Sequence, residues 1–67
     1  MNKTTHFVYQ VFGSNKWLDL YSEQYSDSKE VWDSVSENLK QLRERSPDVK
    51  YRVLIREVLT KEITAQL

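Results

Sequence analysis

The chain contains one glycine, Gly13, and one proline, Pro47, in 67 residues. Glycine and proline are the strongest punctuation of local structure in a sequence, so few breaks divide this chain into long segments. Ser-Asn-Lys follows Gly13, and Gly13 and Asn15 are both able to adopt the positive φ of a tight turn. Pro47 disfavours helical structure in the residue before it. The two residues therefore predict a turn after Gly13 and a helix that ends before Pro47.

The segments on either side of Gly13 have the composition and period of strands. Thr5 to Phe12 is β-branched and aromatic, which favours a strand, and it is apolar on both faces, as in a central or covered strand. In Trp17 to Tyr25, Leu18 and Leu20 share one face. The opposite face of that segment carries Trp17, Asp19, Tyr21, Glu23 and Tyr25. The two segments predict an antiparallel hairpin.

A helix is predicted from Ser28 to Arg45. Asp27 is a suitable N-cap, and Glu30 lies three residues later, which is the spacing of a capping box. Apolar residues then recur at helical spacing, with Trp32 widening the stripe. The stripe consists of Val31, Val35, Leu39 and Leu42.

A third strand is predicted from Val49 to about Thr60, with apolar and basic residues on alternate positions. One face carries Val49, Tyr51, Val53 and Ile55, and the other carries Lys50, Arg52, Leu54, Arg56 and Val58. The element order ββαβ allows two sheets. The second strand can be central, with a parallel crossover to the third, or the first can be central, in the antiparallel order 2-1-3. We favour the second arrangement because it explains why the first strand is apolar on both faces.

The predicted fold is therefore a single α+β domain over residues 1–67, a three-stranded and mainly antiparallel sheet with one helix on one face. We expect residues 61–67 to form a frayed tail, because their charged residues and threonine favour a frayed end. The predicted core consists of Leu18, Leu20, Val31, Val35, Leu39, Leu42, Val53 and Ile55, together with one face of the first strand.

The composition argues against catalytic and metal chemistry. The sequence has no cysteine and a single histidine, His6, which excludes disulfides, thiolate sites and multi-histidine sites. One glycine is too few for a phosphate-binding loop, and a hydrolase built on His6 would need a nucleophile elbow that the sequence lacks. We therefore predict a non-enzymatic protein with no catalytic, cofactor or metal site.

The sheet face away from the helix is the predicted binding surface. Its candidate partner-binding residues are Trp17, Tyr21, Tyr25, Arg52, Leu54 and Arg56. Aromatic and arginine residues dominate protein-interface hot spots, although they also form stacking platforms for nucleic acids. Ten basic and ten acidic residues balance, and the interspersed Asp19 and Glu23 would repel phosphates. We therefore favour a protein partner over the alternative, binding of single-stranded nucleic acid through Trp17, Tyr21, Arg52 and Arg56.

A second copy of the chain is another predicted partner. A two-fold dimer would set Arg52 and Arg56 of one chain against Asp19 and Glu23 of the other, with the third strand as the exposed edge. No apolar run of signal-peptide or membrane-spanning length is present. We therefore expect no membrane partner and a cytoplasmic location.

The final strand carries a short motif. In the stretch from Pro47 to Val58, Tyr51 and Arg52 are followed by Arg56. With the aromatic hairpin and the single helix bearing Trp32, this layout resembles short accessory proteins of unknown function encoded by tailed bacteriophages and prophages. The resemblance implies an accessory protein in the host cytoplasm that regulates or inhibits host or phage machinery by binding. It implies no catalytic residues.

Overall fold

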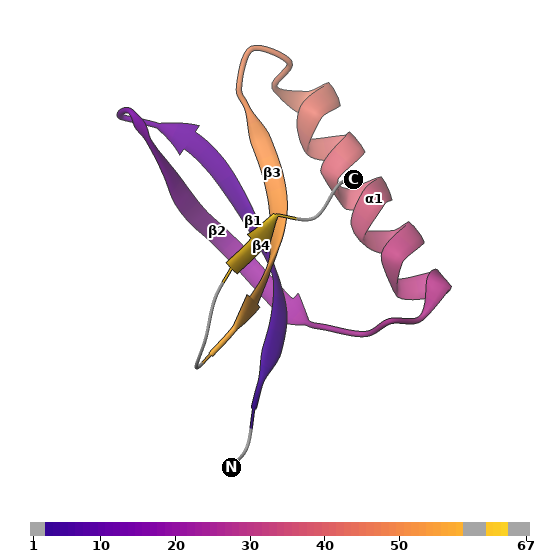
Figure 1. Cartoon of the computed structure of the whole chain (residues 1–67). Coiled ribbons are helices and arrows are strands. Elements are labelled where there is room, and N and C mark those ends of the chain that lie inside the picture. Colours follow the sequence, from indigo (N-terminus) through magenta and orange to yellow (C-terminus); the bar gives the residue numbers. More distant parts are fainter. Residues whose placement is uncertain (1–2, 59–61, 65–67) are drawn as a thin grey trace.

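The computed structural model describes residues 3–58 and 62–64 of the chain. Four strands and one helix follow one another as β1 (Thr5–Gly13), β2 (Lys16–Gln24), α1 (Lys29–Arg45), β3 (Tyr51–Glu57) and β4 (Glu62–Thr64). In Figure 1 the helix runs along one side of the sheet, and the tip of the β1–β2 hairpin projects away from it.

The strands form one antiparallel sheet in the order β2-β1-β3-β4. This arrangement confirms the α+β class, the ββαβ layout with the first strand central, and the helix on one face. The third strand is shorter than predicted and is not an edge, because β4 pairs with it. Glu62–Thr64 form that short strand rather than a frayed tail, and the rest of the predicted tail, 61 and 65–67, lies outside the described residues.

The hairpin turn consists of Ser14 and Asn15, whose φ values are 53° and 64°. A two-residue loop with positive φ at both positions is the type I′ turn, whose twist matches that of the flanking strands. Of the two residues able to adopt positive φ, Asn15 does so and Gly13 does not. Gly13 instead pairs with Lys16 at the end of the ladder, so the left-handed positions fall on the two residues that follow it.

The helix begins at Lys29, one residue later than predicted, and its N-cap is shifted by one residue as well. Ser28, not Asp27, is the N-cap, and its side chain accepts a hydrogen bond of 3.3 Å from the Val31 amide. At the other end the Ser46 amide donates to the Leu42 carbonyl at 3.1 Å. The helix thus stops before Pro47, as predicted.

The core lies between α1 and the central strands. Its buried members are Phe7, Tyr9, Val35, Leu39 and Val53. Partly buried residues packed against them are Tyr25, Val31, Trp32, Leu42, Tyr51 and Ile55. The predicted helix stripe and the apolar face of β3 are thereby confirmed as core.

Leu18 and Leu20 do not belong to this core, contrary to the prediction. They are 40% and 46% exposed. A β-bulge is one cause, because Tyr9 pairs with Tyr21 while Gln10 pairs with Asp19, which leaves Leu20 as an extra residue in β2. The other cause is position, since β2 is the sheet edge and its hairpin tip diverges from α1 (Figure 1).

Candidate functional site

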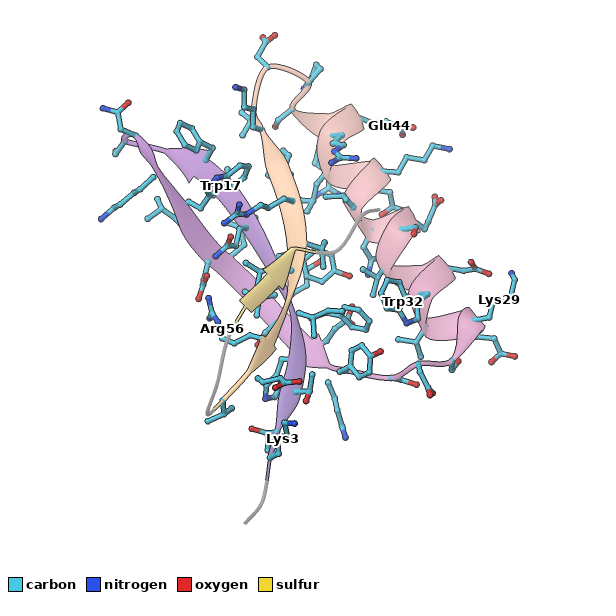
Figure 2. All side chains as sticks on the ribbon, in the orientation of Figure 1. Lys3, Trp17, Lys29, Trp32, Glu44 and Arg56 are labelled. Atoms are coloured by element: carbon cyan, nitrogen blue, oxygen red, sulfur yellow. The ribbon has the colours of Figure 1, made fainter. Side chains whose placement is uncertain are left out.

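The bulge divides β2 between two surfaces. Residues before it that pair with Gln10 and Phe12 of β1 lie on the sheet face away from α1, called here the distal face. Tyr21 and Glu23, after the bulge, pair with the core residues Tyr9 and Phe7 and lie on the helix side. Figure 2 shows Trp17 and Arg56 on the opposite side of the sheet from Trp32, which lies between the sheet and the helix.

A polar network crosses three strands on the distal face. Arg56 donates from Nη1 to Asp19 Oδ2 at 2.7 Å and from Nη2 to Asp19 Oδ1 at 3.3 Å. Gln10 donates from Nε2 to Asp19 Oδ1 at 2.7 Å. The Gln10 Oε1 atom accepts a hydrogen bond of 2.8 Å from Arg52 Nε. The Gln10 amide therefore binds both Arg52 of β3 and Asp19 of β2, and Asp19 in turn binds Arg56 of β3.

Aromatic rings continue this network towards the hairpin tip. The Arg52 guanidinium lies over the Trp17 ring, with its central carbon 4.2 Å from the ring centroid. Phe12 meets Trp17 edge-on at a centroid distance of 5.3 Å, and the Lys50 ammonium lies 6.0 Å from the Phe12 centroid. We call this continuous set the aromatic–arginine strip. It comprises Phe12, Trp17, Arg52, Gln10, Asp19 and Arg56.

The strip combines a buried base with an accessible rim. Gln10 is only 4% exposed, whereas Phe12 is 39% exposed. The hydrogen bond from Arg56 is the main cause that lowers the pKa of Asp19, and that from Gln10 adds to it. Asp19 is therefore ionised at neutral pH, and the pair with Arg56 is a fixed part of the surface.

The predicted binding residues do not all meet on this face. Trp17, Arg52 and Arg56 do. Leu54 shares the face, but it is 1% exposed and pairs with the buried Val8, so it forms a small apolar layer under the polar one. It is not available to a partner.

Tyr21 and Tyr25 lie on the helix side, which corrects their placement on the open face. Tyr21 stacks on Tyr9 at a centroid distance of 4.3 Å. Tyr25 lies 5.0 Å from the Phe7 ring and 6.3 Å from the Trp32 ring. A strict period of two put all the odd residues of this strand together, and the extra residue at the bulge separates them.

The same correction applies to the ion pairs expected between two chains. Asp19 already pairs with Arg56 of its own chain. Glu23 lies on the helix side, where its Oε1 atom accepts a hydrogen bond of 2.6 Å from the Tyr9 hydroxyl. Both carboxylates therefore bind partners within their own chain rather than arginines of a second copy.

Tyr9 is the most embedded polar group on the helix side. Asn38 donates from Nδ2 to its hydroxyl oxygen at 3.1 Å, while the hydroxyl donates to Glu23. Burial, reinforced by the hydrogen bond to Glu23, raises the pKa of Tyr9 well above its ordinary value. The Tyr9 hydroxyl therefore links α1 to the sheet through Asn38 and Glu23. Because its pKa is raised, this phenol is unsuited to proton transfer at neutral pH.

Surface depressions on the helix side carry no catalytic constellation. One of about 160 Å³ lies between β2 and α1 and is lined by Tyr21, Asn38, Gln41, Leu42 and Arg45. Another, of about 300 Å³, lies against the last turns of the helix and is lined by Gln41, Glu44 and Arg45. Neither includes His6 or a serine that a base could activate.

The described part of the chain shows neither a metal-binding cluster nor a membrane-spanning helix. Residues 3–58 and 62–64 contain no group of three or more histidine, cysteine, aspartate or glutamate side chains placed to hold a metal ion. Within the same residues, no helix is both long enough and apolar enough to cross a bilayer.

Two members of the strip escaped the sequence analysis. Phe12 belongs to the predicted first strand that is apolar on both faces, and Gln10 lies within the same strand. A lone polar residue in a central strand is a usable signal, because a buried amide requires hydrogen-bond partners. Its partners are not evident from the sequence, since they come from two other strands.

Comparison with known proteins does not place the chain in a family. No protein-family model matches the sequence, and neither a curated protein nor a solved structure shows detectable similarity to it. The function must therefore be argued from the strip itself.

Proposed function

We propose that this protein is a non-enzymatic module that binds another protein through the aromatic–arginine strip. The observation that carries the proposal is the position of Arg52, held between the Trp17 ring and the buried Gln10 amide. Tryptophan and arginine are the side chains most enriched in interface hot spots. Side chains already fixed in the free protein lose less conformational entropy when a partner binds.

The contacts of Trp17 favour a protein over a nucleic acid. Base recognition on a sheet needs an aromatic face on which a base can stack. In this structure Arg52 covers one face of Trp17, and Phe12 contacts the ring edge-on. The other end of the strip holds the Arg56–Asp19 ion pair, which offers no cation for a second phosphate, and the chain has no net positive charge.

The resemblance to short phage-encoded accessory proteins supports a biological role of the same kind. We propose a partner among host or phage proteins, whose activity the chain regulates or inhibits in the host cytoplasm. Inhibition by binding needs only a stable surface, which fits a strip held by hydrogen bonds across three strands.

The proposal is tested by differential capture. The wild-type chain, Trp17→Ala and the exposed helix variant Lys40→Ala are immobilised and exposed to lysate of the native host, with bound proteins identified by mass spectrometry. Circular dichroism first establishes that both variants are folded. A partner of the strip should be retained by the wild type and Lys40→Ala and lost by Trp17→Ala.

The nucleic-acid alternative has its own measurement. Single-stranded DNA and RNA are titrated in mobility-shift assays at two salt concentrations. We expect weak binding at both. Tight binding with a steep salt dependence, lost in Trp17→Ala, would replace the protein-binding proposal with the nucleic-acid one.

A further inference from the structure

Among the residues that the structure describes, the distal face holds one arginine that binds a carboxylate, Arg56, and one that does not, Arg52. Arg56 uses both terminal nitrogens on Asp19. Arg52, four residues earlier on the same face of β3, engages among the described residues only its Nε atom, with Gln10, and the face of its guanidinium, with Trp17. We propose that Arg52 receives an aspartate or glutamate side chain from an acidic segment of a partner protein.

The geometry of Arg52 leaves one side of the guanidinium for such a group. Arginine has five N–H donors in a rigid fork. The hydrogen bond to Gln10 uses the Nε–H, and the contact with Trp17 uses one π-face. Among the residues that the structure describes, no group accepts a hydrogen bond from Arg52 Nη1 or Nη2. These terminal nitrogens can bind the two oxygens of a carboxylate end-on.

Arg56 shows what Arg52 lacks. Its end-on pair with Asp19 is the arrangement expected at Arg52 when a partner is bound. Asp19 binds Arg56 through both oxygens and Gln10 through Oδ1, and Arg52 reaches this carboxylate only through the Gln10 amide. A carboxylate for Arg52 therefore has to come from outside the network.

The charge around Arg52 complements an acidic segment. Lys50 lies two residues before Arg52, and its ammonium flanks the aromatic pair on the side of Phe12. Lys50 is exposed, and this end of the strip therefore carries two cations around Phe12 and Trp17 while the nearest strip carboxylate is neutralised by Arg56. A second acidic group one helical turn, or two residues of a strand, along the partner would meet Lys50.

A carboxylate fits this site better than a phosphodiester. The planar fork of an arginine pairs with two oxygens of either a carboxylate or a phosphate, so the surroundings of Arg52 decide between them. A nucleic-acid strand that continued along the strip would next meet Arg56, which is already paired with Asp19, so the strip offers no second cation for the next phosphate. Phosphate binding is therefore an outcome that the test must separate from carboxylate binding.

The test uses a defined probe and needs no native partner. Isotope-labelled protein is titrated with an acetylated and amidated peptide of four glutamates, and separately with the matched peptide of four glutamines, inorganic phosphate and a thymidine oligonucleotide. The resonances followed are the Arg52 Nε–H and Nη–H groups and the Trp17 indole N–H. We expect saturable shifts of Arg52 with the glutamate peptide alone.

Two matched variants sharpen the result. Arg52→Lys keeps the charge but loses the fork, and should weaken binding of the glutamate peptide by about fivefold or more. Arg45→Lys makes the same chemical change on the exposed end of α1 and should bind as the wild type does. Equal shifts with the glutamate and glutamine peptides, unchanged affinity in Arg52→Lys, or tighter binding of phosphate or oligonucleotide at Arg52 would each overturn the inference.

This inference rests on the proposed function, but the two fail separately. Suppose that a protein is captured only when Trp17 is present and binds Arg52→Lys as tightly as the wild type. The proposal that Arg52 binds a carboxylate would then be wrong, while the proposed protein-binding function would stand. If the glutamate peptide binds specifically but no protein is captured in a Trp17-dependent manner, the carboxylate-binding role of Arg52 would stand and the proposed protein-binding function would be wrong. The glutamine-peptide control on the wild type decides the point even if Arg52→Lys does not fold.

Discussion

The side chain of Gln10 organises the distal face because it both donates and accepts. Its Nε2 group donates to Asp19 and its Oε1 atom accepts from Arg52, so a neutral amide fixes groups of opposite charge on either side of the central strand. Its burial matters for the same reason, since hydrogen bonds shielded from water are electrostatically stronger than exposed ones. On the helix side the Tyr9 hydroxyl has the equivalent place, between Glu23 and Asn38.

Replacement of Tyr9 by phenylalanine tests that second network. Tyr9→Phe should lower the free energy of unfolding by about 1–2 kcal/mol, because Glu23 and Asn38 each lose a hydrogen-bond partner. Urea unfolding followed by circular dichroism measures the change. Tyr21→Phe, which alters a tyrosine that is half exposed, is the control and should have little effect.

The raised pKa of Tyr9 also predicts a loss of stability in alkali. The folded state holds the phenol proton more tightly than the unfolded chain, in which the pKa is near 10.0. This contribution to stability is complete below that value and is lost as the pH rises through the folded pKa. Unfolding measured between pH 8 and 11 should show the decline in the wild type and in Tyr21→Phe, and a smaller one in Tyr9→Phe.

Among the predicted core leucines, Leu39 is buried while Leu18 and Leu20 are exposed, a difference that the sequence alone did not indicate. Leu39→Ala should cost roughly 2–5 kcal/mol, because the side chain is fully enclosed between α1 and the sheet. Leu20→Ala should cost less than about 1 kcal/mol. Thermal and urea unfolding of the two variants provide the comparison, and similar losses would contradict the core described here.

At the level of elements, sequence patterns predicted the type and order of every long segment. The helix stripe from Val31 to Leu42 and the alternation of Tyr51 to Arg56 identified which faces are buried, because the helix and β3 keep a regular period. β2 does not. Its bulge interrupts the period of two at Leu20, and no turn residue or proline in the sequence marks that position. The candidate site was consequently half predicted, with Trp17, Arg52 and Arg56 placed correctly and Tyr21 and Tyr25 on the wrong face.

The bulge makes a specific prediction about deletions. Removal of Leu20 deletes the extra residue, so Asp19 and Tyr21 become neighbours in a regular ladder and keep their partners Gln10 and Tyr9. We expect this variant to fold with a free energy of unfolding within about 1 kcal/mol of the wild type. NMR should find the pKa of Asp19 still lowered, because Arg56 remains its partner.

Removal of Leu18 is the matched control. A regular ladder would then place Asp19 opposite Val11 on the helix side and Leu20 opposite Gln10 on the distal face. Asp19 loses Arg56 and Gln10, so its pKa should return to the ordinary range, and stability should fall by about 1–3 kcal/mol. If the pKa of Asp19 were the same in both deletion variants, the bulge would not determine on which face of the sheet Asp19 lies.

For the whole molecule, the edges of the sheet determine how two copies can meet. β4 pairs with Leu54 to Arg56 of β3, so β2 is the longest free edge among the described strands. Alternate residues of β1 bond to β2 and to β3, as the bonds from Tyr25 to Thr5 and from Phe12 to Lys50 show. By this alternation the Ser22 amide points to the outer edge. We keep the homodimer as a prediction and assign it to β2.

Sedimentation at several concentrations tests this assignment. We expect a weak dimer, because a bulge in an edge strand limits regular pairing. Ser22→Pro removes an outward N–H without removing a ladder bond and should give a folded monomer. A wild-type chain that stays monomeric at high micromolar concentration, with a melting temperature independent of dilution, would show the dimer prediction to be wrong.

The two tryptophans of the chain stand on opposite sides of the sheet (Figure 2). Trp32 meets Phe7 edge-on at 5.2 Å between the sheet and the helix, while Trp17 lies beneath Arg52 on the distal face. Each indole therefore senses a different environment, one the interior and the other the surface. With Trp32 replaced by phenylalanine, the remaining emission would come from Trp17 alone, and a change in its intensity on mixing would report occupancy of the strip without any attached label.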